Sequence, residues 1–97
     1  MIIHTVLLDL DPDKPVEIDA ALEGLRSLAT LPGVVSMTAG PNVSPENLGK
    51  GFTHAAVVEF ESAAARDAYI PAPEHLAVVA GLQACMRRVV VVDIEAA

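Results

Sequence analysis

The side chains that could do chemistry in this chain are few. Besides the carboxylates they are three histidines, one tyrosine and one cysteine: His4, His54, His75, Tyr69 and Cys85. The sequence contains no glycine-rich phosphate loop, no CxxC or HExxH motif and no nucleophile elbow. We therefore expect no cofactor and no metal ion, so that any catalysis would be acid–base chemistry by histidine and tyrosine.

His75 has the most informative spacing of these residues. It precedes Val79, Leu82 and Met86 at i+4, i+7 and i+11, so the four side chains share one face of a helix. Three of the four are apolar, which predicts that His75 points at the sheet. Its place in the first turn, at the positive end of the helix, disfavours imidazolium, although Glu74 acts in the opposite direction. A neutral imidazole is the form that a general base needs.

The other candidates are placed by the strands on which they lie. His4 starts the first predicted strand and His54 starts the third, which runs antiparallel to it, so these two histidines should lie at opposite ends of the sheet. This placement argues against a three-histidine metal site. The broken helix that carries His75 follows the end of the third strand, which lies beside the start of the first, so His75 should lie at the same end of the sheet as His4. Tyr69 lies six residues before His75, and only a break at Pro71–Pro73 could turn its hydroxyl toward the histidine.

We therefore predict His75, Tyr69 and His4 as the catalytic candidates. Each of them also fits a purely structural role, as a hydrogen-bonded or packed side chain of a small domain. His54 fits a structural position or a contact between subunits. Cys85 fits a small buried hydrophobic side chain, which is the usual role of a free cysteine.

Hydrophobic periodicity predicts four strands and two helices, the second of them broken. The strands are expected over 2–10, 34–39, 52–61 and 89–95, and the helices over 15–30, 63–70 and 74–86. Asp13 is expected to cap the first helix and Ser62 the second, with Arg87 and Arg88 at the negative end of the last. The order βαββαβ predicts an antiparallel sheet with strand order 4-1-3-2 and helices on one face. This is a ferredoxin-like α+β fold, formed as a single domain over 1–97.

The strands are apolar on both sides, whereas helices of one chain can cover only one side of the sheet. The first strand has Ile2, Val6 and Leu8 on one side and Ile3, Thr5 and Leu7 on the other. The fourth has Val90, Val92 and Ile94 on one side and Val89 and Val91 on the other, and the third carries Ala55 and Val57 opposite its phenylalanines. Leaving aliphatic side chains in water forgoes about 1.5–3 kcal/mol each. We therefore predict a homodimer in which two sheets pack face to face, with a total interface above about 1,000 Å². The alternative is that small residues and loops shield this face.

Composition excludes several kinds of partner. The 97 residues are 53% hydrophobic and carry a net charge of −7, which disfavours nucleic acid and anionic membranes. No apolar run is long enough to cross a bilayer. The lone Cys85 and a start without signal-peptide features predict a cytoplasmic protein.

Several segments together resemble the stress-responsive α/β-barrel (Dabb) family. They are the opening Ile3–Leu8, the turn 31–34, the loop 40–46, Gly51–His54, the run 58–62, Asp67–Tyr69 and Pro73–His75. They follow the family's order over nearly the whole chain. The resemblance implies a dimeric α+β barrel, in agreement with the argument from the strands.

Within that family the chain is similar to plant polyketide cyclases of the olivetolic acid cyclase type. The similarity involves His4, His54, Tyr69 and His75. It implies that His75 acts as the base and Tyr69 assists, in cyclase or lyase chemistry on a small apolar or polyketide-like ligand without a cofactor. Pro71 departs from the aliphatic residue expected there. Two alternatives are a non-enzymatic stress or assembly protein and a cofactor-free monooxygenase of similar dimeric fold.

Overall fold

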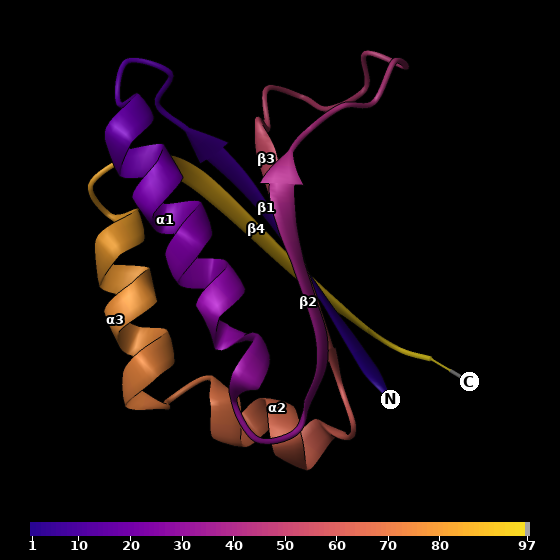
Figure 1. Ribbon diagram of the computed structural model, residues 1–97. Helices are drawn as coiled ribbons and strands as arrows, with labels where there is room; N and C mark the ends of the chain where they lie inside the picture. The colour runs from indigo at the N-terminus through magenta and orange to yellow at the C-terminus, as the bar shows by residue number, and fades with distance from the viewer. Residues whose placement is uncertain (97) are drawn as a thin grey trace.

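Residues 1–96 are described by the structure, which is a computed structural model, and they form one sheet with helices against it (Figure 1). In chain order the elements are β1 (Ile2–Leu10), α1 (Pro15–Ser27), the short 3₁₀ turn η1 (Leu28–Thr30), β2 (Val34–Pro41), β3 (His54–Phe60), α2 (Ala63–Tyr69), α3 (Pro73–Leu82) and β4 (Met86–Glu95).

The sheet has the strand order β2-β3-β1-β4, with every neighbouring pair antiparallel. This order confirms the predicted 4-1-3-2 arrangement, with β1 in the interior. The helices lie together on one face, with α1 and α3 side by side across it and α2 near one end (Figure 1). The chain therefore has the ferredoxin-like α+β fold.

The core lies between the sheet and the helices. β1 contributes Ile2, Leu8 and Leu10 to it, because alternate residues of a strand point to the same face. Leu22 and Leu25, three residues apart on α1, pack against this layer. Phe60 and Leu28 complete the core near α2. Each fully buried large side chain stabilises the fold by about 1.5–3 kcal/mol.

The opposite face of the sheet has no helix over it among the described residues (Figure 1). The apolar side chains there belong to three neighbouring strands. The register places Ile3 and Leu7 of β1 beside Ile94 and Val90 of β4, and Leu7 beside Ala55 of β3 on its other side. The β4 side chains are 38% exposed at Val90, 54% at Val92 and 56% at Ile94. Shielding by loops of the same chain is therefore ruled out for these side chains.

The end of α3 was predicted wrongly. The helix ends at Leu82 and β4 begins at Met86, so Arg87 and Arg88 lie on the strand rather than at a helix terminus. The reason is a tertiary ion pair with Asp9 of β1: Arg87 Nη2 lies 2.6 Å from Asp9 Oδ1, and Arg88 Nε lies 2.9 Å from Oδ2. These two hydrogen bonds lower the pKa of Asp9 below its ordinary value, and the bond from Arg87 has the larger effect.

The caps and the other boundaries differ in smaller ways. Ser62 caps α2 as predicted, accepting a hydrogen bond from the backbone N–H of Ala65. Asp13 does not cap α1: Lys14 occupies the cap position, without a side-chain hydrogen bond. α1 ends at Ser27 and passes into η1, β2 continues to Pro41, and β3 begins at His54 rather than at residue 52.

Candidate functional site

A cavity of about 370 Å³ lies between the inner face of the sheet and the helices. His4, Tyr69 and His75 all line it, so the structure brings the three catalytic candidates to one place. The rest of the lining is apolar apart from Gln83, and comes from all four strands and all three described α-helices or their ends: Val6, Leu8, Leu25, Met37, Ala56, Val58, Ile70, Val79, Leu82, Met86, Val89 and Val91.

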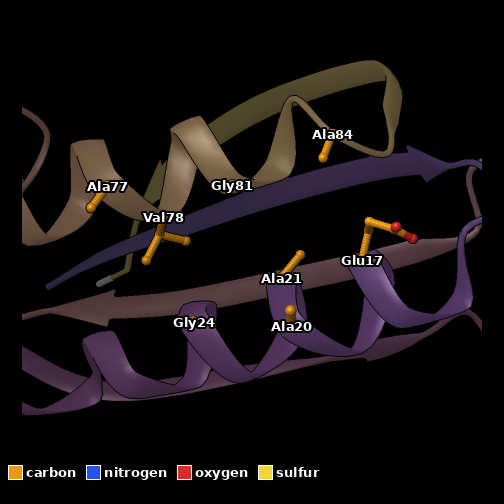
Figure 2. Close-up of a pocket in the computed structure, with 8 residues that line it drawn as sticks. All are labelled: Glu17, Ala20, Ala21, Gly24, Ala77, Val78, Gly81 and Ala84. Carbon is orange, nitrogen blue, oxygen red and sulfur yellow. The ribbon is translucent and has the colours of Figure 1, made fainter.

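A second hollow, of about 400 Å³, lies between α1 and α3 (Figure 2). Its lining consists of small side chains with one carboxylate: Glu17, Ala20, Ala21, Gly24, Ala77, Val78, Gly81 and Ala84. None of the catalytic candidates is among these described residues. The cavity beside His75 is therefore the candidate site.

His75 lies in the first turn of α3 and faces the cavity. Val79 and Leu82 line the same cavity, as the helical spacing predicts. Met86 also lines it, but from the start of β4 rather than from the helix, so its predicted place on the helix face was wrong. The Nδ1 atom of His75 is 2.7 Å from the carbonyl oxygen of Ile70. Because a carbonyl oxygen can only accept, Nδ1 must carry the hydrogen and donate it. In the neutral ring Nε2 then has a free lone pair, which is the state that can take up a proton.

Tyr69 is brought to His75 by the break between the two helices. α2 ends at Tyr69 and α3 begins at Pro73, and this change of direction leaves the two ring centroids 4.6 Å apart. Tyr69 is 4% exposed, and its burial raises the pKa of the phenol to about 12. The hydroxyl therefore keeps its proton at neutral pH and can donate a hydrogen bond.

His4 comes from β1, on the inner face of the sheet. It is buried, and its Nδ1 atom lies 2.6 Å from Oδ1 of Asp93, the residue opposite it on β4. The other carboxylate oxygen of Asp93 accepts a hydrogen bond of 3.1 Å from Arg66 Nη1. The His4 ring makes edge contacts with Phe60 and Tyr69, at centroid distances of 5.9 and 6.4 Å. A chain of polar and aromatic groups thus runs from β4 to α3.

Asp93 and Arg66 were missed by the sequence analysis. The signal for Asp93 was present, because it is the one charged residue in the aliphatic run from Val89 to Ile94. It faces His4 only because β1 and β4 pair in the observed register. Arg66 had no comparable signal in the sequence.

His54 lies apart from the other two histidines. His4 pairs with Val58 on the β1–β3 ladder, four residues from His54, and His54 does not line the cavity. Its Nδ1 atom is 2.7 Å from the Thr53 hydroxyl, and burial lowers the pKa of its imidazole. The three histidines are thus not gathered into one site.

Cys85 belongs to the core packed against α1. Burial raises the pKa of its thiol, and this is the main cause of the shift. Within residues 1–96 no three histidine, cysteine, aspartate or glutamate side chains are grouped so as to hold a metal ion. No helix in the same range combines the length and the apolar character needed to cross a membrane.

Comparison with protein families tests the family resemblance that the sequence motifs indicate. The family model described as the stress responsive A/B barrel domain, Dabb, matches residues 2–96. The chain belongs to the Dabb family. No curated protein matches this Dabb chain, so the similarity to polyketide cyclases of the olivetolic acid cyclase type stays a prediction.

Solved structures with the same fold agree with this assignment. A dimeric ferredoxin-like protein of unknown function from Jannaschia sp. CCS1 is 30% identical over 98% of both chains, with a TM-score of 0.86. A protein of Arabidopsis thaliana is 26% identical over 100% of this chain and 96% of its own, with a TM-score of 0.88. The hydroxynitrile lyase of Passiflora edulis is 22% identical over 96% and 90%, with a TM-score of 0.85, which shows the common fold.

Proposed function

We propose that this Dabb protein binds a small, largely apolar carbonyl compound and performs cofactor-free acid–base chemistry on it, of the lyase or cyclase type. The observation that carries this proposal is the arrangement of His75. Its Nδ1–H is held by the carbonyl of Ile70, its Nε2 is left as the basic atom, and its ring lies beside a protonated tyrosine in an apolar cavity.

The chemistry follows from these two groups. Nε2 of His75 takes a proton from the carbon next to the carbonyl, and the C–H electron pair moves to form an enolate. The Tyr69 hydroxyl donates a hydrogen bond to the oxygen on which negative charge develops. The enolate carbon can then attack a second carbonyl in a cyclisation. In the lyase direction, the base instead takes the proton of a hydroxyl group, whose oxygen forms a C=O bond to its carbon. The electron pair of the broken C–C bond leaves with the other fragment as a carbanion, which takes up the proton from the base.

The cavity indicates an aliphatic ligand. Its volume of about 370 Å³ is near the lower end of the roughly 300–1,000 Å³ of small-molecule sites. Apart from the two histidines, Tyr69 is the one aromatic residue in the lining, so a flat aromatic ligand would find few rings to stack on. The same fold carries a hydroxynitrile lyase in Passiflora edulis, which supports chemistry of this class.

The test is exchange of the hydrogens next to a carbonyl, followed by proton NMR in D₂O. Aliphatic ketones and aliphatic 3-oxoacyl N-acetylcysteamine thioesters serve as probes, each measured against its own uncatalysed rate. We expect the protein to accelerate exchange for at least one probe, and His75→Ala to lower that acceleration by about 10²–10⁴-fold. The matched control is His54→Gln, which alters a histidine outside the cavity and should leave the rate unchanged.

Equal exchange with the protein and with His75→Ala, for every probe, would contradict the proposal. That result would favour the alternative of a non-enzymatic stress or assembly protein, in which the histidines are structural.

We also infer that the working form is a homodimer joined through the open sheet face. The exposed aliphatic side chains of β4 support this, because a monomer would leave them in water. The Jannaschia relative, described as dimeric, supports it independently. The cytoplasmic location indicated by the lone Cys85 stays a prediction.

A further inference from the structure

The two histidines of the cavity differ in the group that holds Nδ1. The Nδ1–H of His75 meets a neutral backbone carbonyl, whereas Nδ1 of His4 meets the carboxylate of Asp93. A carboxylate stabilises positive charge on the imidazole, as the aspartate does in a serine protease triad. A neutral carbonyl does so less. The two rings therefore suit different roles in a proton transfer, His75 as the acceptor of a proton and His4 as the donor.

We propose that Asp93, held in place by Arg66, is a positioning residue that fixes His4 as the proton donor of the site. The proposal rests on the proposed function, since it names a second acid–base group for the same chemistry. His4 keeps its hydrogen on Nδ1, toward Asp93, and exchanges protons through Nε2.

The contacts around Asp93 fix its carboxylate from two sides. Oδ1 accepts from His4 at 2.6 Å, and Oδ2 accepts from Arg66 at 3.1 Å. Arg66 is itself held by Asp67 of the same helix, at 3.1 Å. These bonds connect β1, β4 and α2, so the orientation of His4 depends on three elements at once.

The second ring nitrogen of His4 is the one available to a ligand. Among residues 1–96 no fully buried side-chain nitrogen or oxygen lacks a hydrogen-bond partner, so Nε2 is not sealed unpaired in the core. His4 also lines the cavity together with Tyr69 and His75. Nε2 can thus reach a group bound there.

The proton transfer balances with these two histidines. Nε2 of His75 takes the proton from carbon, while Nε2–H of protonated His4 gives a proton to the carbonyl oxygen. The product is a neutral enol, with His75 charged and His4 neutral. When the enol reacts or returns to the ketone, the two protons move back and both rings regain their first state. No oxidant or other reactant is needed.

The first experiment reads the tautomer of His4 directly, without any substrate. In ¹⁵N-labelled protein at a pH where both rings are neutral, long-range ¹H–¹⁵N spectra show which ring nitrogen carries hydrogen. We expect hydrogen on Nδ1 of His4. Asp93→Asn can offer an amide N–H to Nδ1, so hydrogen should move to Nε2, as in the corresponding aspartate variant of the protease triad.

Two controls accompany this measurement. Asp67→Asn removes the other carboxylate on Arg66 without touching His4, and should leave the His4 tautomer unchanged. The signal of His75, held by the backbone, should not move in any of these variants and so reports an intact site. Arg66→Gln serves as a second variant in case Asp93→Asn does not fold, since it leaves the Asp93 carboxylate in place. Without Arg66 to hold that carboxylate, we expect more than one set of ring signals for His4.

Exchange rates then connect the tautomer to the chemistry. Asp93→Asn should lower the catalysed exchange of the best probe by about 10²-fold, with Arg66→Gln lowering it less. Hydrogen on Nε2 of His4 in the unmodified protein, or an unchanged tautomer in Asp93→Asn, would overturn the positioning role. Absence of exchange with the expected tautomers would instead overturn the proposed function and leave the geometry standing.

Discussion

At the scale of single residues, Tyr69 allows a direct measurement because it is the one tyrosine of a chain without tryptophan. Burial raises the pKa of its phenol to about 12, whereas an ordinary tyrosine has a pKa near 10. Ultraviolet absorption of the phenolate should therefore show a single transition near pH 12. A transition near pH 10 would mean that the side chain is solvated in solution.

The same shift makes a prediction about stability. The raised pKa means that the unfolded chain loses the Tyr69 proton before the folded protein does. The contribution of this group is therefore complete below pH 10 and is lost as the pH rises from 10 toward 12. The free energy of unfolding in urea should be lower at pH 11 than at pH 9. The fall should be smaller in Tyr69→Phe, which lacks the phenol, because lysine and arginine titrate equally in both proteins.

How well single residues could be predicted depended on the range of the interaction. His75 was placed from local spacing alone, because Val79 and Leu82 define a helical face. Tyr69 required only the recognition of a proline break. Asp93 and Arg66 could not be found this way, since their contacts with His4 depend on the pairing of β1 with β4 and on where α2 lies.

At the scale of elements, the approach of α2 to the turn before β2 depends on one glycine. Gly33 has a φ of +81°, and a Cβ atom built there would lie 2.5 Å from the Cβ of Ala65 on α2. Gly33→Ala should therefore lower the free energy of unfolding by about 2–4 kcal/mol, through backbone strain and overpacking. Because α2 carries Tyr69 and Arg66, the variant should also disturb the site.

The matched control for this glycine lies on α3. A Cβ atom at Gly81 would have no neighbour within 4 Å, and the residue has an ordinary helical position. Gly81→Ala should raise the free energy of unfolding by about 0.5–1 kcal/mol, because alanine loses less backbone entropy in a helix. Urea unfolding of both variants decides the point. Equal effects would contradict a close contact between Gly33 and α2.

Element boundaries show where local rules were sufficient. The N-terminus of α2 was predicted from Ser62, because a serine cap is a local hydrogen bond. The last helix was predicted too long, since helix-end chemistry alone assigned Arg87 and Arg88 to its terminus. Their partner Asp9 lies 78 and 79 residues away in the sequence, so no local pattern could assign them to β4.

At the scale of the whole molecule, the open sheet face makes the remaining prediction. Sedimentation at micromolar concentration should give twice the mass of one chain. Val92→Asp places a charge on this face of β4, where burial in the contact would leave it unpaired in each subunit at a cost of several kcal/mol. We expect that variant to sediment as a monomer. Val16→Asp, on an exposed position of α1 away from the sheet, should stay dimeric. A folded monomer of the unmodified chain would mean that these aliphatic side chains remain in water, contrary to the argument that predicts the dimer.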